Sequence, residues 1–118
     1  MLNYLKKIFS IFLIFNLTFV SSAQANATFV DSFDVSGQDT TPRGLTFNND
    51  GTKMFVAGND GDDINEYTLT TGFDVSSATF VDSFDISGQD TTPQGIAFNN
   101  DGTKMFVVGN TGDDINIY

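Results

Sequence analysis

The chain has 118 residues, with 15 acidic and 5 basic side chains, a formal net charge of −10, and no Cys or His. This composition excludes disulfides, a lipid-modified N-terminal cysteine, thiol nucleophiles, His-based catalytic triads and zinc sites built on Cys or His. The negative charge repels phosphate backbones and anionic lipid headgroups, so we expect no nucleic-acid partner and no membrane-surface partner.

The first 25 residues have the pattern of a secretory signal peptide. Lys6 and Lys7 precede an apolar run from Ile8 to Val20, and Ala23-Gln24-Ala25 supplies a small-x-small cleavage pattern. The run is shorter than the roughly 20 apolar residues that a membrane span needs. We therefore predict a signal peptide at residues 1–25 and a secreted or periplasmic protein that has no membrane association after cleavage.

The rest of the chain shows the pattern of short strands separated by turns, without helical periodicity. The expected strands of the first half are Thr28–Val35, Leu45–Phe47, Lys53–Gly58 and Ile64–Leu69, and Thr79–Ile86 restarts the pattern. Asp50-Gly51 supplies the positive φ that a tight hairpin needs. Lys53–Gly58 is apolar on both faces, which is typical of a strand buried on both sides.

This strand pattern is written twice, because residues 27–67 recur 51 positions later as residues 78–118. Seven of the 41 aligned pairs differ: Val35/Ile86, Arg43/Gln94, Leu45/Ile96, Thr46/Ala97, Ala57/Val108, Asp60/Thr111 and Glu66/Ile117. A period near 50 residues is typical of solenoids, propellers and arrays of small units. We predict an all-β fold of two repeats: residues 26–77 with a leading outer strand, and residues 78–118 truncated before the last strand.

Both copies contain the pattern Pro-x-Gly-(apolar)-x-Phe-x-x-Asp-Gly-Thr-Lys-(apolar)-(aromatic)-Val. This pattern resembles the bacterial YVTN-type, or lactonase-like, β-propeller repeat. The matching residues of the first copy are Pro42, Gly44, Leu45, Phe47, Asp50, Gly51, Thr52, Lys53, Met54, Phe55 and Val56. Those of the second copy are Pro93, Gly95, Ile96, Phe98, Asp101, Gly102, Thr103, Lys104, Met105, Phe106 and Val107. The resemblance implies propeller blades, each a four-stranded antiparallel sheet, with Leu45–Phe47 and Ile96–Phe98 as innermost strands along a central channel.

With Leu45–Phe47 and Ile96–Phe98 as innermost strands, the chain holds one complete blade and one broken blade, whose missing outer strand could be Thr28–Val35. Two blades do not close a ring, because propellers use about 4–8 blades. We therefore expect an incomplete propeller, as a fragment of a longer chain that carries further blades, or one that is closed by homo-oligomerisation. The lack of terminal caps favours the fragment.

The acidic turns Asp60-Gly61-Asp62-Asp63 and Gly112-Asp113-Asp114 are the candidate metal ligands. Calcium prefers oxygen ligands, yet this spacing matches no EF-hand, and Asp60 is replaced by Thr111 in the second copy. We favour turns in which Asp side chains cap backbone N–H groups, with calcium as the alternative. We predict no other cofactor.

No motif for covalent catalysis, nucleotide binding or dinucleotide binding occurs, so we predict no catalytic, cofactor-binding or metal residues. Phe29, Phe33, Phe47 and Phe55 fall at strand positions, where a place in the core is favoured over a sugar-stacking role. Gly58 and Gly109 end strands at expected close approaches. The copies can specialise at Arg43/Gln94, Thr46/Ala97 and Asp60/Thr111.

We therefore predict an exported, non-enzymatic β-propeller repeat module that serves as a binding or interaction scaffold for a protein or carbohydrate ligand. The resemblance leaves an enzyme open, since YVTN-type propellers resemble lactonases and the propeller subunits of quinone-dependent amine dehydrogenases. Fold alone does not imply function. A two-blade homo-oligomeric lectin is the third alternative, although the chain lacks Trp, the best stacking residue for sugars.

Overall fold

A computed structural model describes residues 27–118, and the predicted signal peptide at residues 1–25 lies outside these described residues. The elements in chain order are β1 (Pro42–Phe47), β2 (Lys53–Gly58), β3 (Asp63–Leu69), the 3-10 helix η1 (Val75–Ser77), β4 (Ala78–Asp85), β5 (Pro93–Phe98), β6 (Met105–Gly109) and β7 (Ile115–Ile117). Strands β1 to β4 form the first sheet, and β5 to β7 form the second. Every pairing is antiparallel, so the predicted all-β class is confirmed.

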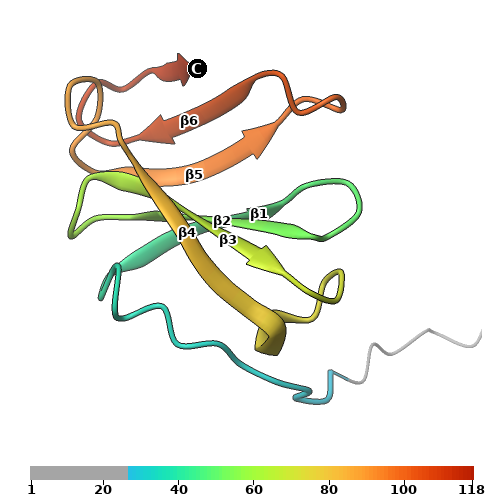
Figure 1. Cartoon of the computed structure of the whole chain (residues 1–118). Coiled ribbons are helices and arrows are strands. Elements are labelled where there is room, and N and C mark those ends of the chain that lie inside the picture. The colour runs from blue at the N-terminus through green and yellow to red at the C-terminus, as the bar shows by residue number, and fades with distance from the viewer. Residues whose placement is uncertain (1–26) are drawn as a thin grey trace, which may run out of the picture.

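The two sheets stack face to face, with β1 and β2 of the first sheet beside β5 of the second (Figure 1). Backbones approach closely at Gly44, where a Cβ atom would lie 3.0 Å from the Cα of Gly95. The rings of Phe55 and Phe98 meet across the same junction with centroids 4.6 Å apart. The sheets pack as neighbouring layers and do not close a ring.

Strand β2 has two apolar faces, as the sequence predicts, and each face enters a different core. Met54 and Val56 belong to a cluster with Tyr67 and Leu69, on the side of the first sheet that faces away from the second sheet. Ala57 belongs to the cluster between the sheets, whose other buried members are Ile64, Ile86 and Val107. Two neighbouring layers are therefore needed to bury this one strand.

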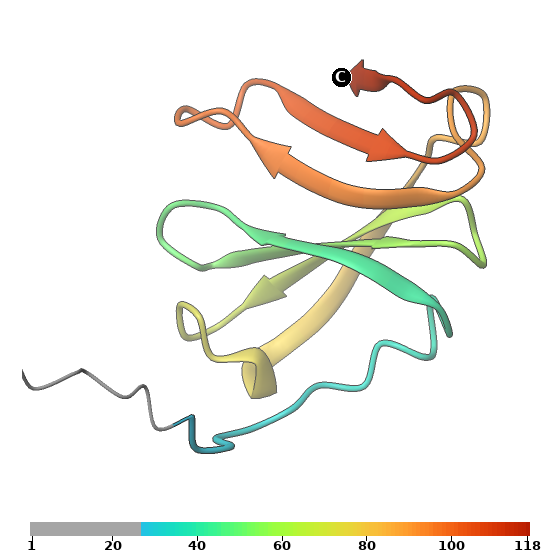
Figure 2. The ribbon, with the colours of Figure 1, turned by 180° about the vertical axis from the view of Figure 1, so that it is seen from behind.

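The structure differs from the sequence prediction at Thr28–Val35, which forms no strand. This segment runs beneath the first sheet (Figure 2) as irregular backbone. A strand needs a neighbour for its backbone N–H and C=O groups, and no other strand of the described chain pairs with this segment. Phe29 is 80% exposed, so the expectation that it lies in the core is wrong, whereas Phe33 packs against the first core cluster.

The remaining predicted strands lie within a few residues of the observed ones, and β1 is longer at its start than expected. Phe47 and Phe55 pack against the cores as predicted. In residues 27–118 no helix has the length and apolar character that crossing a membrane requires.

Candidate functional site

The candidate site lies between the two hairpin turns, which follow β1 and β5 and have the same sequence, Asn-Asn-Asp-Gly. Gly51 and Gly102 adopt φ angles of 72° and 69°, which favour glycine, and close the two turns. The amide N–H of Gly51 donates to the carbonyl of Asn48 at 3.1 Å. Both turns project from the same end of the stacked sheets (Figure 1).

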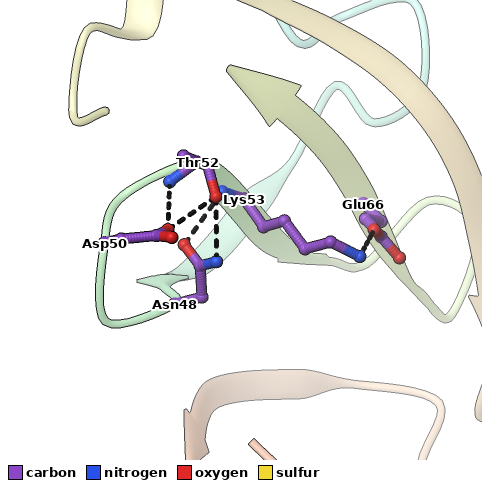
Figure 3. Close-up of polar contacts among 5 residues, drawn as sticks. All are labelled: Asn48, Asp50, Thr52, Lys53 and Glu66. Atoms are coloured by element: carbon purple, nitrogen blue, oxygen red, sulfur yellow. Dashed lines mark hydrogen bonds and ion pairs between the residues drawn. The ribbon is translucent and has the colours of Figure 1, made fainter. Parts of the chain in front are cut away.

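Side chains hold each turn in one conformation, and Figure 3 shows those of the first turn. The Asp50 carboxylate accepts bonds from the Thr52 hydroxyl at 2.6 Å and the Thr52 N–H at 3.0 Å. Asn48 donates to the Thr52 hydroxyl at 3.1 Å and accepts from the Lys53 N–H at 2.9 Å. The second turn repeats this network with equal or nearly equal lengths. The site is therefore pre-formed by local bonds.

These hydrogen bonds also favour the ionised form of the turn carboxylates. The Thr52 hydroxyl and then its N–H lower the pKa of Asp50 below the ordinary value, and Thr103 does the same for Asp101. Lys53 forms an ion pair with Glu66 at 2.6 Å, on the face of the first sheet (Figure 3). Both turn carboxylates therefore stay ionised at neutral pH.

A groove of about 490 Å³ lies between the two turns. Its lining residues are Thr46, Phe47, Asn48, Asn49, Asp50, Lys53, Phe55, Ala97, Phe98, Asn99, Asn100, Asp101 and Gly102. The Asn49 amide crosses from the first turn and donates to the backbone carbonyl of Asn100 at 2.6 Å. Phe55 and Phe98 supply an aromatic surface among these amides and carboxylates.

The opposite end of the sheets carries the acidic turn that the sequence offered for calcium. Here Asp60 accepts bonds from the N–H and hydroxyl of Thr40 and, at 3.1 Å, from the hydroxyl of Thr41. In the second copy, Thr111 bonds Thr91 and Thr92 through hydroxyls at 2.9 and 3.0 Å. Asp60 thus acts as a clamp on the preceding loop, as expected for a turn-capping side chain.

Residues 27–118 contain no group of three or more Asp or Glu side chains arranged to hold a metal ion. Calcium at the acidic turn stays a prediction. Asp63, in the same turn, has its pKa raised by burial, and the nearby carboxylates Asp39, Asp85 and Asp62 add to the effect.

Two equivalent carboxylates, those of Asp39 and Asp90, are buried near the acidic turns. Asp39 is 2% exposed and accepts from the N–H groups of Thr41 at 2.5 Å and Asp60 at 3.0 Å. Asp90 is its equivalent and lies directly over Gly109, where a Cβ atom would overlap its carboxylate; Gly58 has the same relation to Asp39. The packing role predicted for both glycines is confirmed.

The structure separates the three variable pairs that the sequence singled out. Thr46 and Ala97 both line the groove, whereas Asp60 and Thr111 are clamps at the opposite end. Arg43 borders an apolar hollow on the outer face of the first sheet. The sequence alone does not single out the groove amides of Asn49 and Asn100, because Asn before Asp-Gly is ordinary turn chemistry. Their repetition before both Asp-Gly pairs is the available signal.

A scan of the chain against protein-family models gives no match, and a search of curated proteins finds no similar sequence. The chemistry of the site therefore has to be argued from its own residues. The groove offers amide donors, carbonyl and carboxylate acceptors, one lysine and an aromatic surface. These groups can bind a polar ligand.

Proposed function

We propose that the chain is an exported, non-enzymatic β-propeller repeat module that acts as a binding scaffold, and that the groove between its hairpin turns binds neutral carbohydrate. The groove is the observation that carries this proposal. It forms between two repeats, has a pre-formed polar lining, and has a volume of about 490 Å³, within the roughly 300–1,000 Å³ of small-ligand sites.

The lining favours a neutral ligand rich in hydroxyl groups. The side-chain amides of Asn49 and Asn100 each offer donors and an acceptor, which suits hydroxyls that both donate and accept. The ionised Asp50 and Asp101 repel anionic ligands and accept bonds from sugar hydroxyls. The Phe55–Phe98 pair supplies an apolar surface for the C–H face of a sugar ring.

The propeller part of the proposal is supported by the way the sheets stack. A four-stranded antiparallel sheet packed face to face on its neighbour through an apolar core is the arrangement of propeller blades. Export is supported by the signal-peptide pattern of residues 1–25. We infer a secreted or periplasmic location on that ground.

The test is to apply the purified chain to an array of printed neutral and acidic oligosaccharides. We expect binding to neutral members, and about tenfold weaker affinity for Asn49→Ala and for Asn100→Ala, the size of one lost hydrogen bond. Gln94→Ala is the matched control, because this exposed amide lies outside the groove.

An array without any bound glycan overturns the carbohydrate proposal, and equal binding by the groove variants and the Gln94 variant overturns the site. Hydrolysis of a simple lactone by the purified chain, lost in the Asp101→Asn variant, contradicts the non-enzymatic part.

A further inference from the structure

The second sheet exposes apolar side chains whose equivalents in the first sheet are buried. Ile115 is 68% exposed and Val108 is 46% exposed, against 2% for Ile64 and 0% for Ala57 at the same positions of the first copy. Within the described residues, strand β7 pairs only with β6, whereas its equivalent β3 pairs with both β2 and β4. The outer face and one edge of the second sheet are therefore open.

Sequence differences between the copies make this open face more apolar, which is the opposite of what contact with water favours. Two of the differences between the copies that fall here replace Ala57 by Val108 and Glu66 by Ile117. Both replacements make the face more apolar, although Val108 and Ile117 are more exposed than most apolar residues in the described part of the chain. An exposed apolar patch of this kind marks a contact surface.

The complementary surface lies on the other side of the first sheet. An apolar hollow of about 330 Å³ is lined there by residues that include Leu45, Met54 and Val56. Their equivalents in the second sheet, Ile96, Met105 and Val107, pack in the core between the sheets, where the first sheet covers them. The hollow is therefore lined by residues whose equivalents in the second sheet are covered by a neighbouring sheet, and the corresponding neighbour here is the outer face of a second sheet.

The N-terminal segment has the sequence of β4, and its second half contacts the first sheet as the end of β4 and the turn after it contact the second sheet. Phe33 meets Tyr67 edge to face at 5.5 Å, as Phe84 meets Tyr118 at 5.3 Å. The Tyr67 hydroxyl donates to Gln38 at 3.3 Å, and Tyr118 donates to Gln89 at 3.4 Å. Residues 33–38 thus dock on the first sheet as residues 84–89 dock on the second, while residues 28–32 stay exposed.

We infer that the second sheet of one copy binds the first sheet of a second copy, head to tail, and that residues 28–34 of this second copy add as a strand to β7. The pairing of β3 with β4 supplies the register. Ile64 pairs with Phe84 and Asn65 with Ser83, so Ile115 pairs with Phe33 and Asn116 with Ser32 of the second copy. Main-chain bonds to an open sheet edge then supply affinity and side chains supply specificity.

Charge favours this pairing. In the first sheet Glu66 lies opposite Asp82, two like charges, and Lys53 offsets them through its ion pair with Glu66. At the junction between copies Ile117 takes the place of Glu66 and lies opposite Asp31, so that no like-charge pair forms. The contact is heterologous, and it generates a ring if its rotation closes.

This inference rests on the proposed stacking of propeller repeats, but it is measured without any carbohydrate ligand. The chain has no Cys, so single cysteines report on one contact each. A Ser32→Cys chain is mixed with an Asn116→Cys chain under mild oxidation. We expect a disulfide-linked dimer, since the template pair Ser83 and Asn65 bonds directly at 2.6 Å.

The matched control pairs Ser32→Cys with Ile117→Cys, because a shift of one residue moves the side chain to the other face of the strand. Failure of the first mixture to cross-link, or equal cross-linking in both mixtures, overturns the inference. A disulfide in the first mixture alone supports it.

Light scattering of the purified chain at micromolar concentration gives a second, independent measurement. We expect oligomers for the wild-type chain, and at least tenfold weaker association for Ile115→Asp, with an unchanged far-UV circular dichroism spectrum because this side chain is exposed. A monomeric wild-type chain overturns the inference. The Ile115→Asp variant keeps the groove between the turns, so glycan binding by it separates failure of this inference from failure of the proposed function.

Discussion

The two sheets have nearly the same sequence, yet they place the same residues in different environments. Tyr67 is 0% exposed and packs between Phe33 and Phe80, whereas its equivalent Tyr118 contacts Phe84 and is partly exposed. Ile64 is buried between layers, whereas Ile115 faces solvent. The difference teaches that burial in this fold is decided by which neighbour lies on each face of a sheet.

The largest expected effect comes from the same truncation made in both sheets. Ile64→Ala removes a buried side chain from the core between the layers, and we expect it to lower the free energy of unfolding by about 2–5 kcal/mol. Ile115→Ala is expected to change it by less than about 0.5 kcal/mol in dilute solution. Urea unfolding followed by circular dichroism measures both. Equal losses would contradict the contrast between the sheets.

Substitution of the two strand-ending glycines gives an intermediate effect. A Cβ atom at Gly58 displaces the carboxylate of Asp39, and one at Gly109 displaces that of Asp90. We expect each Gly→Ala variant to lose about 1–3 kcal/mol of stability through disturbed buried bonds. Gly58→Ala loses more, because among residues 27–118 Asp39 accepts from two backbone N–H groups and Asp90 from Thr92 alone. The same urea titration tests the order, and the exposed Gly37→Ala, with nothing near its Cβ position, is the control.

A smaller effect concerns Asp60 and its equivalent Thr111, which are expected to change the stability of the fold differently when the pH falls. Bonds from Thr40 hydroxyl and N–H, and from Thr41, hold the pKa of Asp60 below its ordinary value. The folded pKa is therefore the lower one, so the clamp stabilises the fold above the ordinary pKa, and this stabilisation is lost as pH falls through the lowered pKa. The loss begins below about pH 4. Thr111 has no charge to lose.

Asp60→Thr gives the first copy the clamp of the second, and we expect urea midpoints at pH 7 and pH 3 to differ less than in the wild-type chain. Thr111→Asp is expected to widen that difference. Asp63, whose pKa is raised, acts in the opposite direction in all three chains, so it cancels from the comparison. A midpoint difference that is the same in all three chains would sink this account of Asp60.

The smallest expected effect concerns the ion pair of the first sheet, which the second sheet lacks because Ile117 replaces Glu66. Lys53 and Glu66 are partly exposed, so Glu66→Gln is expected to cost less than about 1 kcal/mol. Salt screens exposed pairs, and the difference from wild type should vanish in 1 M salt. Lys104→Met, at the equivalent position without this partner, is the control. A loss that persists at high salt would point to packing by the Glu66 side chain.

Strand positions and turns could be predicted from the sequence because they depend on local chemistry. Lys53–Gly58 is found at the residues expected, and Gly51 takes the positive φ that its Asp-Gly pair indicated. Residues 27–34 have the same sequence as β4, ATFVDSFD, but without a paired neighbour they form no strand. Local pattern predicts what a segment can form, and a partner decides whether it does.

The candidate groove could not be predicted in the same way, since it belongs to neither copy alone. Asn49 belongs to one turn and Asn100 to the other, 51 residues later, and each turn by itself has an ordinary hairpin sequence. The distance between them is set by the close approach of Gly44 and Gly95. The Pro-x-Gly pattern of the second copy predicts a strand in that copy alone. The stacking that brings the two turns together depends on how the sheets pack, which no local pattern specifies.

Strand β4 is coded by the start of the second sequence copy and completes the first sheet. The unit of the gene and the unit of the fold are therefore out of phase. When recombination inserts one more 51-residue unit between such copies, the new unit completes the sheet before it and begins another. The number of open sheet edges then stays constant, whatever the number of units. Arrays of this unit can thus gain or lose units by unequal exchange, and no incomplete sheet is left inside the stack.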